Sequence, residues 1–145
     1  MIIREMTIDD IPRVAAMEET DSQTPWSETA LLTYFMRDDT ILMVAEDRGV
    51  PAGFAGLLLL TPESEVLDIT VSHENRRCGC GTALLRSLLD EARRRGITIT
   101  YLEVRDGNLP AKGLYEKLGF EPYGRRANYY TGPCEDAIVM RLSLC

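Results

Sequence analysis

The sequence predicts a mixed α/β (α+β) domain whose central sheet has about seven strands and is flanked by about four helices. First, the spacing of the hydrophobic residues switches between helical and alternating periods in the order β-α-α-β-β-β-α-β-α-β-β. Second, no internal repeat, linker or low-complexity segment divides the 145 residues, so one domain over residues 1–145 is expected. Third, a chain of this length with 45% hydrophobic residues can bury a core without disulfides or metals.

The N-terminal part of the chain is expected to form a strand followed by two helices. Residues 2–6 read as the strand, and Thr7 as the N-cap of a helix over residues 7–19, because acidic residues and Pro12 stand in its first turns. The second helix is expected to start at Ser27, since apolar residues recur there at helical spacing. These residues are Ala30, Leu31, Tyr34 and Phe35.

Three strands are expected next. Residues 41–47 and 52–60 are apolar runs on either side of the turn signal at residues 48–51, which predicts a hairpin. Residues 65–72 then alternate, which predicts a strand with two different faces. Leu67, Ile69 and Val71 are expected on one face, and Asp68, Thr70 and Ser72 on the other.

The second half of the chain alternates helices and strands. Residues 82–96 show a helical pattern that ends at Gly96, a residue suited to the position just after a helix. The expected buried stripe of this helix is Ala83, Leu84, Leu88 and Ala92. The remaining predicted elements are a strand at residues 97–105, a short helix between Asn108 and Gly119, and strands at residues 120–130 and 135–144.

Charge and composition exclude several classes of function. Acidic residues outnumber basic ones by 23 to 16, which gives a formal net charge of −7. Attraction to nucleic acid or to an anionic membrane is therefore not expected, and a cationic partner suits the field of the protein better. Asp9 and Asp10 follow the first residues, and no signal-peptide pattern or apolar run long enough for a membrane span occurs. We expect a soluble, cytoplasmic protein.

A glycine-containing loop, Arg76-Arg77-Cys78-Gly79-Cys80-Gly81, lies where a predicted strand leads into a predicted helix. Glycines let the backbone approach an anion, and free amides at a helix N-terminus point toward it. The loop is neither a Walker A motif nor a dinucleotide-binding fingerprint. Taken alone, it predicts either a phosphate-binding loop or a tight turn that needs glycine at positive φ.

Several motifs together are more specific than this loop. They are Arg76-x-x-Gly79-x-Gly81, Leu102-Glu103-Val104-Arg105, Asn108 and Tyr115-Glu116-Lys117-Leu118-Gly119-Phe120. The set resembles the GNAT acyltransferases, and the element order given above is the GNAT order over nearly the whole chain. Pro25-Trp26-Ser27, Asn128-Tyr129-Tyr130 and Glu135-Asp136-Ala137 look most like the RimI type, the N-acetyltransferases that modify the N-terminal alanine of a ribosomal protein.

Acetyl transfer from a thioester to an amine needs one group that takes a proton from the ammonium and one that protonates the departing thiolate. Glu103 suits the first role if its surroundings are apolar, because such surroundings raise a carboxyl pKa. The residues expected to provide them are Ile97, Ile99 and Tyr101. The alternative is a salt bridge to Arg105. Tyr115 suits the second role, with core packing and a hydrogen-bonded hydroxyl as its alternative. The resemblance implies the catalytic role for both.

The resemblance also implies acetyl-CoA as co-substrate, with no metal ion. The glycine loop would hold its pyrophosphate, and the strand at residues 65–72 would bring backbone groups beside the acetyl and pantetheine groups. Asn108 would contact it as well as capping its own helix. The implied set is Ile69, Thr70, Val71, Arg76, Arg77, Cys78, Gly79, Cys80, Gly81, Thr82 and Asn108.

Trp26, Tyr129 and Tyr130 are candidates to line a peptide-binding groove, although aromatic residues also serve packing alone. The resemblance implies the N-terminal alanine of small-subunit ribosomal protein eighteen as acceptor, and a net-negative enzyme suits a basic ribosomal substrate. Two alternatives stay open. One is an acetyltransferase of a lysine, a polyamine or another small amine, and the other is a non-catalytic CoA-binding module.

The four cysteines, Cys78, Cys80, Cys134 and Cys145, are expected to be free thiols in a reducing cytoplasm. Their spacing, together with the single histidine His73, matches no common zinc pattern. A thiol at a helix N-terminus has a lowered pKa and oxidises more readily. We therefore expect oxidation or alkylation at Cys78 or Cys80 to weaken CoA binding.

Overall fold

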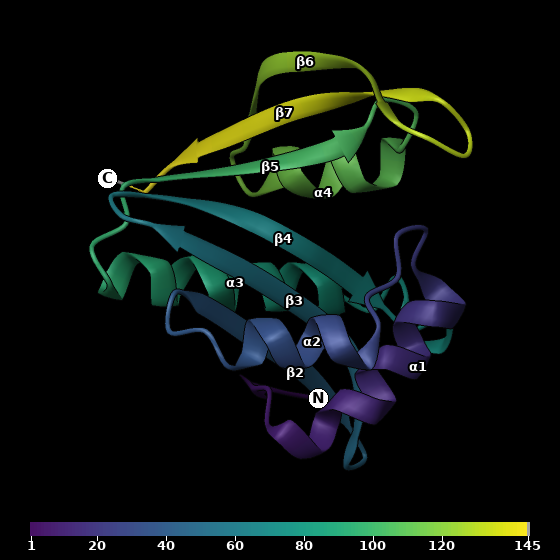
Figure 1. Ribbon diagram of the computed structural model, residues 1–145. Helices are drawn as coiled ribbons and strands as arrows, with labels where there is room; N and C mark the ends of the chain where they lie inside the picture. The colour runs from purple at the N-terminus through teal and green to yellow at the C-terminus, as the bar shows by residue number, and fades with distance from the viewer. Residues whose placement is uncertain (145) are drawn as a thin grey trace.

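Strand pairing arranges the chain around one mixed sheet with the order β1-β2-β3-β4-β5-β7-β6 (Figure 1). The computed structural model describes residues 1–144. The strands are β1 (Ile2–Glu5), β2 (Thr40–Asp47), β3 (Val50–Leu60), β4 (Glu63–Val71), β5 (Ile99–Arg105), β6 (Glu121–Tyr130) and β7 (Glu135–Ser143). The pairing of β4 with β5 is parallel, and every other neighbouring pair is antiparallel. The predicted mixed sheet of seven strands is confirmed.

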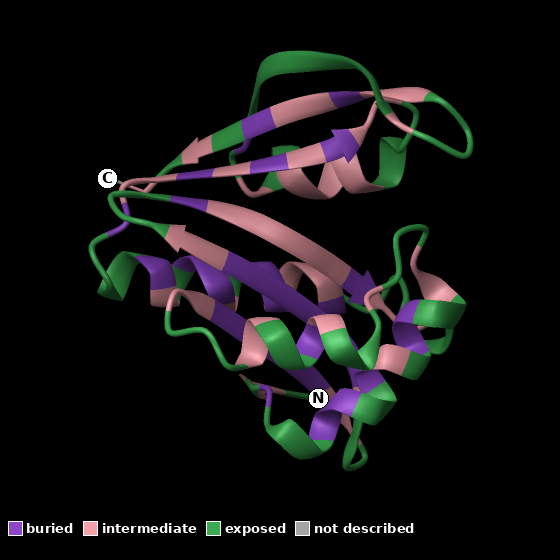
Figure 2. Cartoon of the chain, in the orientation of Figure 1, coloured by how far each residue is buried: buried purple, intermediate pink, exposed green. Residues whose placement is uncertain are grey.

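Two layers of helices cover the two faces of this sheet. The helices are α1 (Ile11–Asp21), α2 (Glu28–Phe35), α3 (Cys80–Arg94) and α4 (Leu109–Lys117). One hydrophobic core joins the sheet to α3 and α4, and a second joins it to α1 and α2. Figure 2 shows buried residues on the central strands and on the inner side of α3, whereas β6 is exposed along its length. In the part of the chain that the structure describes, no helix combines the length and apolarity needed to cross a membrane.

The hydrophobic run of β2 explains how one strand serves both cores. Ile41 and Met43 point to the α3 side, while Leu42 and Val44 point to the α1 side. A strand that is buried on both faces needs an unbroken apolar sequence rather than an alternating one. The second core therefore depends on helices that close over the opposite face of the same strand.

Helix ends follow local signals in the sequence. The side chains of Ser27 and Asn108 accept hydrogen bonds from the amides of Ala30 and Ala111, so both predicted N-caps are confirmed. Gly96 and Gly119 have positive φ after α3 and α4, as expected of glycine in these positions. The first predicted helix instead begins with a short 3₁₀ turn over Ile8–Asp10, and α1 proper starts at Ile11.

Strand β4 contains a bulge that the alternating pattern did not predict. Gly56 of β3 pairs with Asp68, but the next residue, Leu57, pairs with Val66, so Leu67 is left over. The Cβ of Leu67 lies on the side of Gly56 that faces the second core. The expectation that Leu67 shares a face with Ile69 is therefore wrong, because the bulge inverts the alternation at that point.

The packing of β3 against α3 predicts opposite effects for two glycine-to-alanine changes. A Cβ at Gly53 would lie 2.8 Å from Cys80 Sγ and 2.9 Å from Leu84 Cδ1, so Gly53→Ala should destabilise the protein by about 1–3 kcal/mol. Gly113 in α4 has no such neighbour within 4 Å, and Gly113→Ala should stabilise by roughly 0.5–1 kcal/mol. Urea unfolding of both variants measures the difference. Equal stability of Gly53→Ala and the native chain would contradict this packing.

Candidate active site

The parallel strands β4 and β5 separate along their length. They pair only at Glu63–Glu65 with Ile99–Tyr101, and no pairing continues toward the ends of the two strands. Each keeps its outer neighbour, β3 for β4 and β7 for β5. The two strands diverge toward their C-terminal ends in Figure 1. Backbone groups on the inner edges of both strands are therefore available to a ligand that enters from this end.

Glu103 lies on β5 and points to the face opposite α3. Its neighbours Leu102 and Val104 are buried in the core on the α3 side, so the alternation of the strand turns Glu103 the other way. Its side chain is 16% exposed, and Arg126 Nε lies 3.5 Å from its Oε2. Among the described residues, none donates a hydrogen bond to Oε2. The carboxylate is thus largely enclosed, with an oxygen free to accept a proton.

The surroundings of Glu103 agree with expectation at Tyr101, which lines the same cavity, but differ at Ile97 and Arg105. Ile97 is buried in the core on the α3 side and does not line the face of Glu103. Arg105 does not pair with Glu103 but donates to Glu135 Oε1 at 3.4 Å and to two backbone carbonyls of the β6–β7 connection. The charged neighbours of Glu103 are Arg126 and Glu65 instead, because β6 and β4 bring them beside β5.

A cavity of about 250 Å³ borders Glu103. Its lining residues are Leu60, Glu63, Ser64, Glu65, Tyr101, Leu102, Glu103, Tyr123, Arg126 and Val139. Three carboxylates and one guanidinium line it, so its character is acidic. Burial and the charge of Glu103 raise the pKa of Glu65. The Tyr101 hydroxyl donates to Glu63 at 3.2 Å.

Tyr115 on α4 packs against the core on the α3 side, edge-on to Phe120 at 6.0 Å between ring centroids. Burial, followed by the charges of Asp68 and Tyr130, raises its pKa to about 12. The hydroxyl therefore keeps its proton at neutral pH and can donate it. Asp68 from β4 and Tyr130 from β6 therefore lie near this hydroxyl.

Tyr129 and Tyr130 at the end of β6 both lie near Glu103. Burial and the charge of Glu103 raise the pKa of Tyr129. Burial, Glu103 and Tyr129 raise the pKa of Tyr130 to about 12. The guanidinium of Arg105 lies 4.4 Å above the Tyr130 ring, which holds that ring in place. Tyr130 is thus close enough to both Glu103 and Tyr115 for electrostatic interactions between these groups to affect their protonation.

Trp26 is held by packing rather than left free at a groove. Its ring stacks on Tyr34 at 4.6 Å and meets Phe54 edge-on at 5.8 Å. Its backbone amide donates to Glu18 Oε1 at 3.2 Å. The ring therefore belongs to the second core, and the structure does not bring it into contact with Tyr129 or Tyr130 among the interactions of the described residues.

The glycine loop ends in an uncapped helix N-terminus. Gly79, the residue before α3, has φ of +82°, and no side chain caps the first turn. Arg77 also has positive φ, at +64°. The position of a Cβ on Gly81 would be 3.7 Å from Val71 and 3.6 Å from Leu114, so the loop meets β4 and α4. Unpaired amides and the positive end of a 15-residue helix suit an anion here.

The two arginines of the loop differ in the contacts that their side chains make. Arg76 donates to the carbonyl oxygens of Val71 at 3.3 Å and Asp21 at 3.1 Å, and its guanidinium also lies 3.6 Å from the Asp21 carboxylate. It therefore ties the loop to the end of α1 rather than extending toward a ligand. Arg77 is exposed.

The two loop cysteines have opposite environments. Cys78 is exposed and its thiol donates to the Asn75 carbonyl at 2.6 Å. Cys80 is buried against Leu84 and Gly53, and burial raises the pKa of its thiol to about 11. The expectation of a lowered pKa is wrong for Cys80, because loss of hydration outweighs the helix N-terminus. Among residues 1–144, no group of three or more His, Cys, Asp or Glu residues could hold a metal ion.

The strand residues predicted to flank the acetyl group lie beside this loop. Ile69 and Val71 pack into the core on the α3 side, while Thr70 is buried and its hydroxyl donates to Asp68 at 3.2 Å. Asn108 caps α4. The structure therefore gathers the loop, the end of β4 and the start of α4 at one end of the sheet, whereas Trp26 lies in the second core.

The sequence patterns did not single out two carboxyl groups, one buried and one half-buried. Glu18 on α1 is completely buried, and burial raises the pKa of Asp68 on β4 to about 9, with Glu18 as the next cause. A signal was present: Glu18 follows Val14 at helical spacing on the apolar side of α1, and Asp68 interrupts a hydrophobic strand.

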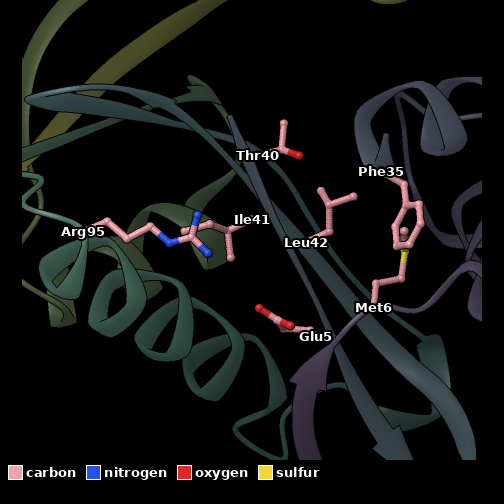
Figure 3. Close-up of a pocket in the computed structure, with 7 residues that line it drawn as sticks. All are labelled: Glu5, Met6, Phe35, Thr40, Ile41, Leu42 and Arg95. Carbon is pink, nitrogen blue, oxygen red and sulfur yellow. The ribbon is translucent and has the colours of Figure 1, made fainter. Parts of the chain in front are cut away.

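A second cavity, of about 140 Å³, lies away from these groups (Figure 3). It is lined by Glu5, Met6, Phe35, Thr40, Ile41, Leu42 and Arg95. It borders β1, β2, α2 and the end of α3, and contains none of the predicted site residues. The gap between β4 and β5 is therefore the candidate active site.

Comparisons with known proteins identify the family of this chain. Residues 8–120 match the family model described as the acetyltransferase (GNAT) family. The [ribosomal protein bS18]-alanine N-acetyltransferase of Escherichia coli K12 is 34% identical over 144 residues, covering 98% of this chain and 97% of that protein. A Bacillus subtilis protein named as a putative enzyme of the same kind is 31% identical, covering 98% of this chain and 95% of that protein.

Solved structures share the fold. The crystal structure of the ribosomal-protein-S18-alanine N-acetyltransferase from E. coli superposes with a TM-score of 0.91 at 34% identity, covering 99% of this chain and 93% of that one. The putative acetyltransferase yncA from Salmonella typhimurium, solved with its cofactor acetyl-CoA, has a TM-score of 0.88 at 21% identity, covering 100% of this chain and 94% of that one. The chain belongs to the acetyltransferase (GNAT) family, as an N-acetyltransferase whose full-length relatives include enzymes of the RimI type.

Proposed function

We propose that this protein transfers an acetyl group from acetyl-CoA to the N-terminal α-amine of a ribosomal protein that begins with alanine, bS18. The observation that supports the proposal is that Tyr130 lies near both Glu103 and Tyr115, which come from different elements of the fold. Relatives that are named for this activity match the chain over nearly its full length.

Glu103 acts as the proton acceptor. Its Oε2 is buried beside Arg126 and accepts no hydrogen bond from the described residues, so it keeps an unused lone pair. The carboxylate takes a proton from the acceptor ammonium, directly or through water, and leaves a nucleophilic amine. The ordinary pKa of an α-amine is about 8, whereas that of a lysine side chain is about 10.4. A weaker base is therefore enough to deprotonate an α-amine.

Tyr115 acts as the proton donor. When bound, acetyl-CoA supplies a thioester carbonyl that the amine can attack, and a C–N bond forms as the C–S bond breaks. Because burial raises the pKa of Tyr115 to about 12, its hydroxyl is protonated and can give its proton to the departing thiolate. The ammonium gives one proton to Glu103, and the nitrogen loses a second proton once the C–N bond has formed. The thiolate takes the proton of Tyr115, the second nitrogen proton restores Tyr115 through water, and Glu103 releases its proton to solvent.

The glycine loop holds the diphosphate of CoA. The uncapped amides at Gly79, Cys80, Gly81 and Thr82 and the N-terminal end of α3 supply donors and positive potential without a metal ion. Arg77 is exposed beside them and can pair with a phosphate, while Arg76 keeps the loop attached to α1. The backbone of Ile69 to Val71 then lies beside the acetyl and pantetheine groups, and Asn108 marks the start of α4 next to them.

The acceptor side of the gap is acidic. Glu63, Glu65 and Glu103 line a cavity with Arg126 as the cationic residue, and the whole chain has a net charge of −7. A basic protein N-terminus complements such a surface better than an acidic or neutral one. Tyr129 and Tyr130 border this side.

An amine panel tests the substrate. Acetyl-CoA consumption should be fastest with a basic peptide that begins with the bS18 N-terminal alanine, and should fall when that α-amine is blocked. A peptide with the same sequence and a free internal lysine but a blocked N-terminus is the matched control. Turnover of a polyamine or of the lysine without turnover of the alanine-first peptide would assign the protein to another acceptor.

Two substitutions test the catalytic pair. Glu103→Gln and Tyr115→Phe should each lower kcat by about tenfold or more, since each removes one proton transfer while nearly preserving shape. Glu116→Gln is the control, because Glu116 is exposed on the same turn of α4. Wild-type kcat in both active-site variants would show that neither group transfers a proton in the slow step.

The thiols of the loop give a further prediction. In a Cys134→Ser/Cys145→Ser background, iodoacetamide should modify exposed Cys78 and spare buried Cys80, because only the former is accessible. Modification should weaken acetyl-CoA binding by steric block, and Cys78→Ser should retain binding while losing this sensitivity. Mass spectrometry locates the adduct and calorimetry measures affinity. Unchanged affinity after full alkylation of Cys78 would place the diphosphate away from the loop.

A further inference from the structure

Glu18 and Asp68 form a carboxyl pair at the contact of α1 with β4, and the catalytic scheme does not use this pair. Glu18 lies on α1 and has no exposed surface, and Asp68 lies on β4 just after the bulge. Asp68 lies within hydrogen-bonding reach of Glu18, whose Oε2 has no other partner among the described residues. Glu18 is cut off from water and Asp68 is only partly exposed, so two ionised carboxylates would repel each other strongly here, and the pair holds a proton at neutral pH.

Each oxygen of Glu18 has a distinct partner. Oε1 accepts the backbone N–H of Trp26 at 3.2 Å. Oε2 is buried, and no N–H or O–H group of the described residues donates a hydrogen bond to it. A proton on Asp68 supplies the missing donor, and the Thr70 hydroxyl in turn donates to Asp68 Oδ2 at 3.2 Å. The proton thus links the α1–α2 connection, residues 22–27, to β4.

This link joins two parts of the proposed site. Ile69, which follows Asp68 directly, is one of the strand residues proposed to lie beside the acetyl group. Trp26 belongs to the connection that follows α1, and Arg76 joins the end of α1 to Val71 at the end of β4. The Trp26 ring itself is fixed against Tyr34 and Phe54. We propose that Asp68 is a positioning residue: in its protonated form it holds the α1–α2 connection against β4. This contact shapes the acceptor side of the cleft, an inference that rests on the function proposed above.

The electrostatic surroundings favour the protonated form. Burial first, and then Glu18, raises the pKa of Asp68 to about 9. The titratable groups that face Asp68 are Glu18 from α1 and Tyr115 from α4, and neither is cationic. On the opposite face of β4, α3 presents apolar side chains. The arginine at this end of α1, Arg76, is already paired with Asp21.

Loss of the proton should release the link. As the pH rises through about 9, both carboxylates become charged and repel each other across the α1–β4 contact. Because the folded-state pKa lies above the unfolded one, folding takes up a proton between these values, and the stabilising contribution falls as pH rises through that window. Asp68→Asn should remove this dependence, since its amide N–H can donate to Glu18 without titrating.

The single tryptophan of the chain gives a readout that is independent of acetyl transfer. In the ligand-free protein, the emission maximum of Trp26 should shift with a midpoint near pH 9, and the shift should be absent in Asp68→Asn. Glu19→Gln, an exposed neighbour on α1, should behave like the native chain. Both variants keep Tyr34, so any quenching by ionised tyrosine is the same in each and cancels in the comparison.

Kinetics with the alanine-first peptide complete the test. In the native enzyme, the KM for the peptide should rise about tenfold at alkaline pH. In Asp68→Asn it should not change with pH, and in Asp68→Ala it should be raised already at pH 7.5. The KM for acetyl-CoA should change little in all three proteins. A pH-dependent emission shift that persists in Asp68→Asn would overturn the proposal, as would a native peptide KM in Asp68→Ala. If the emission shift follows Asp68 but no amine is acetylated, the link stands and the proposed function fails.

Discussion

The separation of β4 from β5 is the constraint on which the rest of the site depends. A continuous ladder would place the ends of the two strands one hydrogen-bond spacing apart and leave no room for a ligand. Pairing stops after Glu65 and Tyr101, and the bulge at Leu67 re-aims the following residues of β4. Each strand keeps its outer partner, so the sheet stays intact while the inner edges remain open to substrates.

This opening lets groups from different elements act together. Glu103 from β5 and Tyr115 from α4 lie on opposite faces of the sheet, and Tyr130 from β6 lies near both, which is why the proposed mechanism uses them together. Burial raises the pKa of Tyr115, while Glu103 stays beside Arg126 on the acidic side. A carboxylate that can accept a proton and a phenol that can donate one are thus kept apart, as direct acyl transfer requires.

Features with local causes were predictable from the sequence. The caps at Ser27 and Asn108 and the stops at Gly96 and Gly119 depend on residues within one helical turn. Features set by tertiary contacts were not. Arg105 pairs with Glu135 instead of Glu103 because β7 lies beside β5, and the Cys80 thiol is buried because β3 has glycine at position 53. The partnership of Glu18 and Asp68 joins residues 50 positions apart, which no local pattern reveals.

A crystal structure of this chain bound to CoA tests the account most directly. The account predicts that the diphosphate rests on the amides of Gly79 to Thr82, that the pantetheine follows the free edge of β4, and that the sulfur ends beside the Tyr115 hydroxyl on the side that opens to Glu103. CoA bound at another surface, or bound in the gap with its sulfur out of reach of Tyr115, would contradict it.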